Sequence, residues 1–340
     1  MRQSAAAALA LTVLLFGGAY LAAGKHPAQE PEPDGGAVRE QSAQGQKDGG
    51  VQLAVKNGDA VEIMALDAYL QGVVRGEMPA SFELEALKAQ AAAERTYIYY
   101  QLAAGRKEVH PNADVCTDPS CCNAWLSEEA AREKWGGDFD GWESRIEEAV
   151  AATDGQVALY DGQPILAVFH SSSAGKTAGA GDVWSGDMPY LRSVDSPEGE
   201  ETVPNYYSAA EFTAAEAKAL LAQAHPELTF SGGPDKWFGA VEKDESGRVG
   251  TVEVCGAPLR GVEVRRIFSL RSACFTIDAA ADRVTFRVTG YGHGVGMSQY
   301  GANELARQGR TWQEILLWYY ADIAIGPAPE TVQTAENVIN

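Results

Sequence analysis

The organisation of the chain is decided by the stretch Gly72-Val-Val-Arg-Gly-Glu-Met-Pro-Ala-Ser-Phe-Glu-Leu-Glu-Ala-Leu-Lys-Ala-Gln-Ala-Ala-Ala-Glu-Arg-Thr-Tyr97. The acid Glu77 is followed by Pro79, a residue tolerated in the first turn of a helix because its missing N–H would be unpaired there anyway. Apolar residues then recur three, four or seven apart on one helical face, at Leu84, Leu87, Ala91, Ile98 and Leu102. Gly105 is typical of a helix end. We therefore expect a long helix to about Ala104, with Glu77 at its entrance.

Glu77 has two interpretations at this position. In the first, its carboxylate only complements the positive end of the helix dipole, which would lower its pKa. In the second, it is a catalytic acid on a rigid support, and apolar burial or a second carboxylate would have to raise its pKa. Position alone leaves both open. The other acids of the helix are better interpreted as solvated charges, at Glu83, Glu85 and Glu94.

The composition restricts the class of protein. The chain has 340 residues and a formal net charge of −20, so it would repel the phosphates of a nucleic acid, and no nucleic-acid partner is expected. With 45% hydrophobic residues, the chain has ample material for a core. Strand-like and helix-like segments occur in mixed runs, not in strict alternation. This order predicts an α+β fold with mixed sheets and a long central helix following Glu77.

Composition also divides the chain. Residues 1–24 are an apolar segment, either an uncleaved membrane anchor or a cleaved signal peptide. We favour the anchor because the run is long for a signal core, and both interpretations put the rest of the chain outside the cytoplasm. The remaining divisions are a flexible linker at 25–50, a domain at 51–322 with a smaller inserted subdomain at 204–250, and a C-terminal tail at 323–340.

Turn and capping signals predict individual elements. Asn57-Gly58-Asp59 is a hairpin turn between strands at 51–55 and 61–64. Ser208 and Glu211 form a capping box before a helix from Phe212 to His225.

A polar loop follows a strand expected at 165–170. Its small residues would let a ligand approach the backbone closely. Ser173-Ala-Gly-Lys176 also spells the S-x-x-K signature of acyl-transfer enzymes, but that motif belongs at a helix start and this loop is rich in glycine. We therefore expect this loop to bind substrate through His170, Ser171, Ser173 and Lys176.

A glycine-rich stretch lies near the C-terminus, Gly290-Tyr-Gly-His-Gly-Val-Gly-Met-Ser-Gln-Tyr-Gly-Ala302. It lacks the G-K-[ST] of a phosphate loop. A lone histidine usually has a structural role in the core, but a glycine-rich loop offers few side chains for a histidine to pack against. We expect Tyr291, His293 and Gln299 to bind substrate.

A possible metal site follows the long helix. Its donors are those of a closed structural zinc site, His110, Cys116, Cys121 and Cys122. Adjacent cysteines on one metal are unusual, so one could be a bystander. The alternative in an exported chain is a disulfide from Cys116 to Cys121 or Cys122. We favour zinc, which would leave the last two of the five cysteines as a pair, Cys255 and Cys274.

Three of these stretches together resemble the stage II sporulation protein D (SpoIID) family of peptidoglycan lytic transglycosylases. One is the stretch around Gly76-Glu-Met-Pro79. The second is Phe169-His-Ser-Ser-Ser-Ala-Gly-Lys-Thr177 with Asp182-Val-Trp-Ser-Gly-Asp-Met-Pro-Tyr-Leu-Arg-Ser-Val-Asp-Ser196, and the third is the glycine-rich stretch. They occur in the family's order, and the resemblance covers roughly residues 51–322.

The resemblance implies roles for individual residues. Glu77 would be the catalytic acid and then the base, since in such enzymes the C6 hydroxyl of the sugar is the nucleophile. Arg95 matches a family position usually preceded by Ala, from which Glu94 departs. Arg95 would bind sugar or orient a carboxylate, or else form an ion pair. Some members of the family carry a metal in the loop of Cys116, and no cofactor is expected for catalysis itself.

The resemblance also implies a setting. The substrate would be peptidoglycan glycan strands already stripped of stem peptides, cut to 1,6-anhydro ends during engulfment in sporulation. The partners would be a sporulation amidase (SpoIIP-like) and a membrane protein (SpoIIM-like). A single-pass N-terminal anchor would hold the catalytic domain outside the cytoplasm, in a sporulating cell on the mother-cell membrane facing the intermembrane space.

Two other functions compete with this one. The first is a Ser/Lys acyl-transfer hydrolase acting on stem peptides, with Ser173 as the nucleophile. The second is a non-catalytic module that binds the cell wall.

Overall fold

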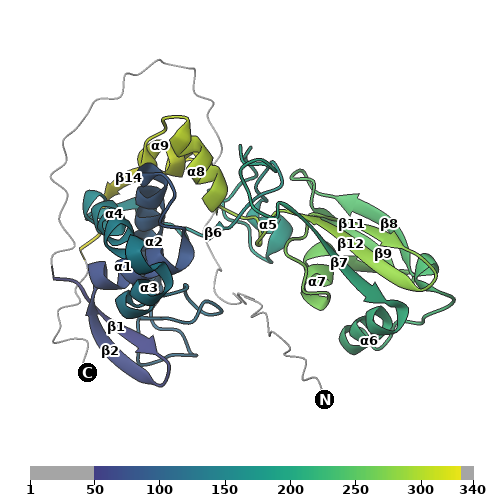
Figure 1. Cartoon of the computed structure of the whole chain (residues 1–340). Helices are drawn as coiled ribbons and strands as arrows, with labels where there is room; N and C mark the ends of the chain where they lie inside the picture. Colours follow the sequence, from purple (N-terminus) through teal and green to yellow (C-terminus); the bar gives the residue numbers. More distant parts are fainter. Residues whose placement is uncertain (1–49, 331–340) are drawn as a thin grey trace, which may run out of the picture.

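The computed structural model describes residues 50–330, which form two lobes (Figure 1). The helices of the larger lobe are α1 (Leu66–Glu77), α2 (Leu84–Ala104), α3 (Glu128–Trp135), the 3₁₀ turn η1 (Gly136–Asp138), α4 (Phe139–Ala152), α8 (Gln299–Arg307) and α9 (Trp312–Tyr319). Its strands are β1 (Gln52–Asn57), β2 (Ala60–Ala65), β3 (Val115–Cys116), β4 (Gln156–Tyr160), β5 (Gln163–Pro164) and β14 (Ala324–Pro327).

The two lobes meet at a short junction and the smaller lobe extends beyond it (Figure 1). The junction contains β6 (Phe169–His170), α5 (Ala180–Val183) and β13 (Met297–Ser298). The smaller lobe contains β7 (Tyr207–Thr213), α6 (Ala214–Ala224), the 3₁₀ turn η2 (Pro234–Lys236), β8 (Phe238–Lys243), β9 (Val249–Val254), β10 (Ala257–Arg260), α7 (Gly261–Ile267), β11 (Phe275–Ala279) and β12 (Arg283–Thr289).

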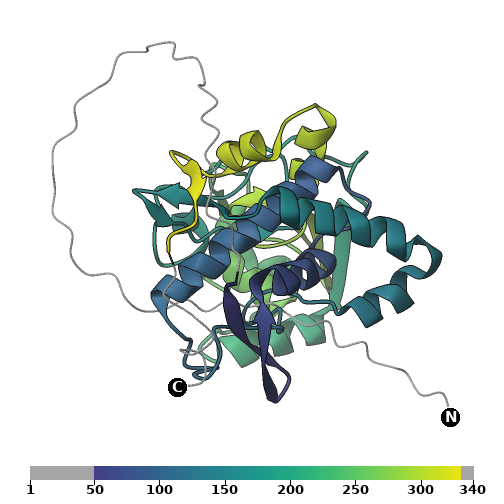
Figure 2. The same cartoon turned by 90° about the vertical axis from the view of Figure 1, so that its left-hand side faces the viewer.

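The long helix α2 is the centre of the larger lobe. Figure 2 shows it crossing the lobe between the β1–β2 hairpin and the α8–α9 pair, and it packs against α1, α4, α8, α9 and β4. Every residue from Ala89 to Tyr99 is buried, so the helix is enclosed on all sides instead of presenting the single apolar face that its spacing predicted. Its alanines explain this, because small side chains let several elements approach one helix.

The start of α2 differs from the prediction. The helix begins at Leu84, and Glu77 is instead the last residue of the preceding helix, α1. Met78 and Pro79 belong to the connection between the two helices. The predicted hairpin turn at Asn57-Gly58-Asp59 does join β1 to β2. The end of α2 at Ala104, with Gly105 as its cap, was predicted correctly.

The sheets are small and mixed, as expected for the α+β class. In the larger lobe β1 lies between β2 and β3, and β4 lies between β14 and β5. In the smaller lobe β12 lies between β11 and β7, and β9 lies between β10 and β8. The pairs β1–β3 and β6–β13 are parallel, and the latter joins two chain segments that are far apart in sequence.

The smaller lobe is larger than the predicted insertion at 204–250. It runs from Tyr207 to Thr289, because β12 pairs with β7 along its whole length, and it has a hydrophobic core of its own. The predicted capping box at Ser208 was wrong, since Ser208 lies within β7. The capping box that begins α6 is formed by Thr213 and Glu216.

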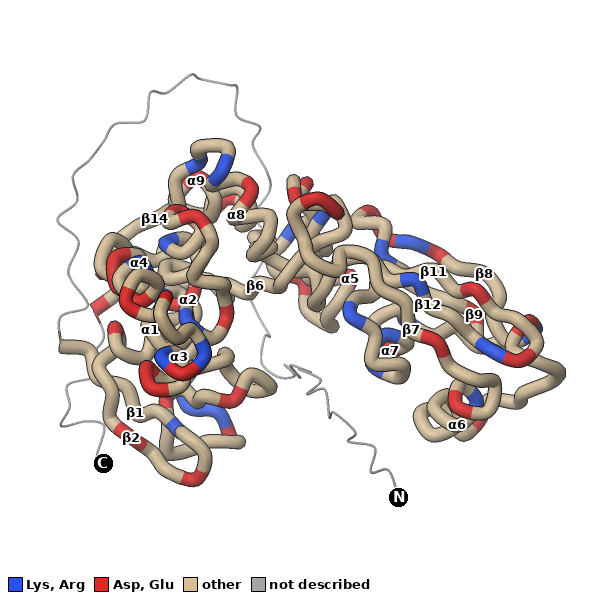
Figure 3. Tube along the Cα trace, in the orientation of Figure 1, with Lys and Arg blue, Asp and Glu red and all other residues tan. Residues whose placement is uncertain are grey.

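The domain also extends past its predicted end at 322, because β14 pairs with β4. The predicted anchor at 1–24, nearly all of the linker and the end of the tail lie outside the described residues. Between residues 50 and 330, no helix combines the length and the apolar character needed to cross a bilayer. Acidic residues occur along the chain in both lobes (Figure 3).

Candidate active site and metal centre

Glu77 ends α1 and is partly buried. The backbone N–H of Ala124 donates to Glu77 Oε1 over 2.5 Å. The side chain of Gln299, at the start of α8, donates from Nε2 to the backbone carbonyl of Glu77 over 2.9 Å. Two segments from distant parts of the chain therefore hold this residue at the end of its helix.

The electrostatic environment of Glu77 favours its neutral form. Burial raises the pKa of Glu77 to about 7, and the hydrogen bond from Ala124 opposes the shift. Its place at the carboxyl end of α1, the negative end of the helix dipole, also disfavours a charged carboxylate. The dipole effect expected from the sequence had the opposite sign, because it assumed that Glu77 lay at a helix start. The carboxyl can therefore hold a proton near neutral pH and release it.

The segment that binds Glu77 lies directly on α1. A Cβ atom at Gly72 would lie 2.0 Å from Nε1 of Trp125, and one at Gly76 would lie 2.6 Å from the carbonyl oxygen of Ala124. The amide of Leu126 donates to the Gly72 carbonyl over 2.9 Å. Only glycine at these two positions of α1 lets the segment come close enough for the Ala124 amide to reach Glu77.

Glu94 was wrongly interpreted as a solvated charge. It is 0% exposed, in the middle of α2. Gln90 donates to Glu94 Oε1 over 2.9 Å, and the side chain of Asn123 donates to Oε2. Burial, and next the charge of Glu77, raise the pKa of Glu94 well above its usual range. A second carboxyl therefore lies near Glu77, enclosed in the core.

Arg95 is also fully buried. Its guanidinium donates to Thr153 Oγ1 over 2.8 Å and to the Val150 carbonyl over 3.1 Å, and lies 3.7 Å from a carboxylate oxygen of Asp67. These contacts tie α2 to the end of α4. Arg95 does not lie where a sugar could contact it, and the ion-pair alternative describes its place better than sugar binding does.

The polar loop after β6 is mostly internal. His170 and Ser173 are buried, and His170 Nε2 is 2.7 Å from Ser173 Oγ. The Ser173 amide donates to Glu198 over 2.6 Å. Ser171 is partly exposed, and its carbonyl accepts from the Tyr300 amide over 3.1 Å.

Lys176 points away from this buried pair. Its side chain is 53% exposed and its Nζ lies 3.5 Å from Asp195 Oδ1. The Ser173 hydroxyl bonds to His170 instead. The Ser–Lys pairing that an acyl-transfer hydrolase needs is therefore not formed in this loop.

The glycine-rich stretch runs along the same junction. Tyr291 is 40% exposed, and the Arg271 guanidinium lies 4.2 Å from its ring centroid. The ring of His293 lies 5.4 Å from that of Trp184 and 5.7 Å from that of His170. Gly296, with a φ of +70°, allows the close approach of the Val168 carbonyl, which a Cβ would meet at 2.1 Å.

The structure brings together parts of all three motifs. The first turns of α8 contact the connection between Glu77 and Leu84 through two hydrogen bonds. The Gln299 side chain donates to the Glu77 carbonyl, and Asn303 Oδ1 accepts from the Glu83 amide over 2.8 Å. Pairing of β13 with β6 joins the glycine-rich stretch to the polar loop. No role was predicted for Asn123 or Ala124 from the sequence. The only signal was the four-residue spacing of Gly72 and Gly76, which leaves one face of α1 without side chains and so allows another segment to pack against it.

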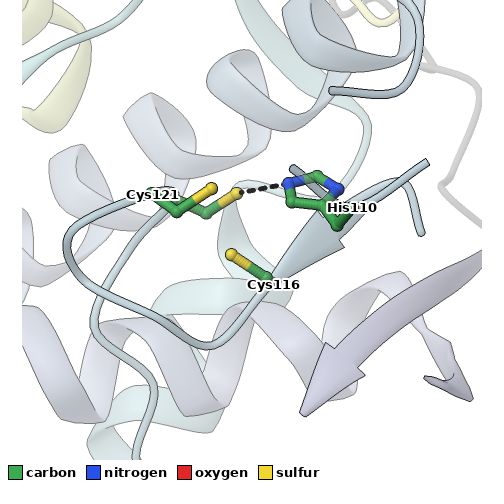
Figure 4. A group of neighbouring side chains, drawn as sticks. His110, Cys116 and Cys121 are labelled. Atoms are coloured by element: carbon green, nitrogen blue, oxygen red, sulfur yellow. Dashed lines mark hydrogen bonds between the residues drawn. The ribbon is translucent and has the colours of Figure 1, made fainter. Parts of the chain in front are cut away.

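The four predicted metal donors converge in the loop after α2. Donor atoms of His110, Cys116, Cys121 and Cys122 all lie within 4.8 Å of one another. Figure 4 shows the labelled side chains of His110, Cys116 and Cys121 turned toward one another. A tetrahedral zinc with Zn–S bonds of about 2.3 Å would place its ligands roughly 3.8 Å apart. The spacing of these four donor atoms fits a tetrahedral zinc after a small contraction.

The surroundings of this cluster suit a metal-bound thiolate set. His110 Nδ1 lies 2.9 Å from the Ala113 carbonyl, so Nδ1 carries the proton and Nε2 faces Cys122 at 3.6 Å. The Lys107 ammonium lies 3.4 Å from the Cys122 sulfur. A hydrogen bond from Cys116, helped by Lys107 and His110, lowers the pKa of Cys122 to about 4.

The predicted pair of Cys255 and Cys274 was wrong. None of the five cysteines, all of which lie in the described residues, forms a disulfide. Cys255 follows the end of β9 at Val254, whereas the Ala273 carbonyl, next to Cys274, accepts from the amide of Val249 at the start of that strand. A strand of this length separates its ends by well over the ~7 Å that two disulfide-linked Cα atoms span.

The chain is similar in sequence to several known proteins. A family model described as Stage II sporulation protein (SpoIID) matches residues 55–160. The stage II sporulation protein D of Bacillus subtilis (strain 168) is 36% identical over 269 residues, which are 79% of this chain and 76% of that protein. The same protein of Bacillus amyloliquefaciens is 35% identical over the same shares. The amidase enhancer of Bacillus subtilis (strain 168) is 28% identical over 74% of this chain and 39% of its own length.

Proposed function

Because the chain belongs to the stage II sporulation protein D family, we propose that it is a lytic transglycosylase that cuts peptidoglycan glycan strands, with Glu77 as its acid and base. The observation that carries the proposal is the state of Glu77. Its carboxyl is partly buried, is held by Ala124 and Gln299, and has a pKa raised to about 7. Such a group can donate a proton and later accept one at neutral pH.

The proposed reaction needs only one carboxyl that reaches the substrate. Glu77 donates its proton to the glycosidic oxygen as the bond from C1 to that oxygen breaks. The C6 hydroxyl of the same sugar attacks C1, forms the 1,6-anhydro bond and returns its proton to Glu77. An intramolecular attack has a large advantage over attack by a free molecule. A hydrolase would need a second carboxyl at the sugar to activate water or attack C1, and Glu94, the second carboxyl near Glu77, is fully buried.

We therefore expect digestion of defined, peptide-free glycan strands in ¹⁸O-labelled water to yield unlabelled fragments. Their new ends should be lighter by one water than reducing ends, because no water enters the product. Mass spectrometry of the fragments measures both properties. The same strands digested by a known muramidase in labelled water are the control, and should gain the heavy oxygen. Incorporation at the ends made by this protein would contradict the transglycosylase proposal and indicate hydrolysis.

We also propose that the cluster of His110, Cys116, Cys121 and Cys122 holds a structural zinc. All four donors converge and three of them are buried, so no position is left open for a substrate, and the metal would stabilise the loop without taking part in the reaction.

Metal analysis of the purified domain is expected to find about one zinc per chain, since four protein ligands complete one tetrahedral site. The paired measurement is a count of free thiols after chelation and unfolding. A protein without metal, whose Cys116 is linked by a disulfide, would refute the site.

The setting implied by the family is part of the same proposal. The enzyme would be held at the cell membrane by its N-terminal segment, with the domain outside the cytoplasm, and would act during engulfment on glycan stripped of stem peptides. The family's place in sporulation and the name of the amidase enhancer to which the chain is similar support a cell-wall role beside an amidase. A membrane protein would complete the assembly.

A further inference from the structure

Glu94 has contacts that helix packing alone does not require. Its side chain is 0% exposed and lies in the middle of α2, among the alanines that pack against the neighbouring helices. Both of its oxygens accept hydrogen bonds, Oε1 from Gln90 at 2.9 Å and Oε2 from Asn123. A buried carboxyl costs stability unless it is fully hydrogen-bonded, so a residue of this kind in a core is expected to have a role.

The contact with Asn123 connects Glu94 to the candidate active site. Asn123 is followed directly by Ala124, whose amide donates to Glu77 Oε1 over 2.5 Å. Two consecutive residues thus hold two carboxyls, one through a side chain and one through the backbone. The next residues are held on α1 by Gly72 and the Leu126 amide, so the position of the Ala124 amide depends on contacts on either side of it.

On the premise of the proposed function, we infer that Glu94 is a positioning residue, which acts through Asn123 to hold the Ala124 amide against the catalytic carboxyl of Glu77. Glu94 itself does not contact substrate, because it is fully enclosed. Without it, the Asn123 side chain loses its partner in the core. A small displacement of the Ala124 amide would then change the orientation of the Glu77 carboxyl, and errors of about 1 Å in a catalytic group can reduce rates roughly 100-fold.

The surroundings of Glu94 disfavour a charged carboxylate at this position. Burial, and next the charge of Glu77, raise its pKa well above the usual range. The other titratable groups that face it are Tyr69 from α1, Tyr97 from α2, Cys122 from the loop after α2 and Tyr320 after α9. An uncharged amide should therefore replace Glu94. The Gln90 Oε1 atom has no hydrogen-bond partner, so rotation of that amide lets it accept from the introduced N–H.

The test compares Glu94→Ala, Glu94→Gln, Asn123→Ala and the Glu94→Ala/Asn123→Ala double variant, with kcat and KM measured on peptide-free glycan. Glu94→Ala should lower kcat roughly 10- to 100-fold with KM within about twofold. Glu94→Gln should stay within about threefold of wild type. Asn123→Ala should lose about as much as Glu94→Ala, and the double variant should lose little more, because both act through one contact. Glu147→Ala, an exposed acid on α4, is the control for deleting a carboxyl.

Melting temperature and zinc content are measured for each variant, so that a folding failure of Glu94→Ala is recognised. Glu94→Gln and Asn123→Ala then still decide the outcome. Equal losses in Glu94→Gln and Glu94→Ala, kcat unchanged in a folded Glu94→Ala, or additive losses in the double variant would each overturn the positioning role. A wild-type protein that releases no fragments, or a Glu77→Gln variant as active as wild type, would instead overturn the proposed function itself.

Discussion

Glu77→Gln is expected to lower kcat for glycan cleavage roughly 10²–10⁴-fold, the usual contribution of a positioned acid–base group. The amide keeps the shape of the side chain and can still accept from the Ala124 N–H, but it has no proton to transfer to the leaving oxygen. Binding of glycan and the melting temperature should stay close to wild type. The measurement is fragment release from peptide-free strands, with a separate pull-down of the variant on those strands.

The matched control is Glu83→Gln in the same connection, where the side chain is 52% exposed and lies 3.8 Å from Arg307. That variant should remain within about twofold of wild type. The pH profile gives a second check. The protonated acid is the active form, so activity should fall as pH rises through about 7, the pKa to which burial raises Glu77. Residual activity of Glu77→Gln within a few-fold of wild type would rule out the assigned role. Equal wall binding without product in both proteins would favour a binding module.

Cys122→Ser is expected to release the proposed zinc and to reduce activity as well. Cys122 is one of four converging donors, and Asn123 and Ala124 follow it directly. Structural zinc contributes about 10–16 kcal/mol of binding free energy in isolated zinc-finger peptides. Even a fraction of that, about 3 kcal/mol, would lower the melting temperature by roughly 6–12 °C. We expect kcat to fall roughly tenfold or more, since the Ala124 amide would no longer be held on Glu77.

Zinc content, melting temperature and kcat are measured on the same preparation. Cys255→Ser is the control, because Cys255 lies outside the cluster, in the turn between β9 and β10. It should leave all three quantities unchanged. Full zinc content in Cys122→Ser, or loss of zinc with no change in kcat, would contradict the proposal that the zinc-binding loop holds the Ala124 amide on Glu77.

Features that depend on neighbouring residues could be predicted from the sequence. The β1–β2 hairpin at Asn57-Gly58-Asp59 and the end of α2 at Gly105 were correct, because turn and cap conformations are properties of a few residues. The convergence of the four candidate metal donors was predictable for the same reason, since all of them lie in one loop. The capping box of α6 was misplaced from Thr213 to Ser208 because two matching signals occur close together.

Only the tertiary structure decided the surroundings of those residues. Glu94 looks like any acid on a helix, and its burial follows from the elements that pack around α2. Cys255 and Cys274 were expected to form a disulfide, but they lie near opposite ends of β9. Arg95 was expected to bind sugar, to orient a carboxylate or to form an ion pair, and its contacts with Thr153 and Val150 place it inside the core.

The family, the class of fold and the identity of the candidate acid were determined by the sequence alone, because motifs and secondary-structure patterns are local in the chain. The chemical state of that acid was decided by the tertiary structure. The pKa of Glu77 depends on burial, on the Ala124 amide and on which end of a helix it occupies. These depend on contacts between residues as distant in sequence as Glu77 and Gln299, and such contacts exist only once the chain has packed.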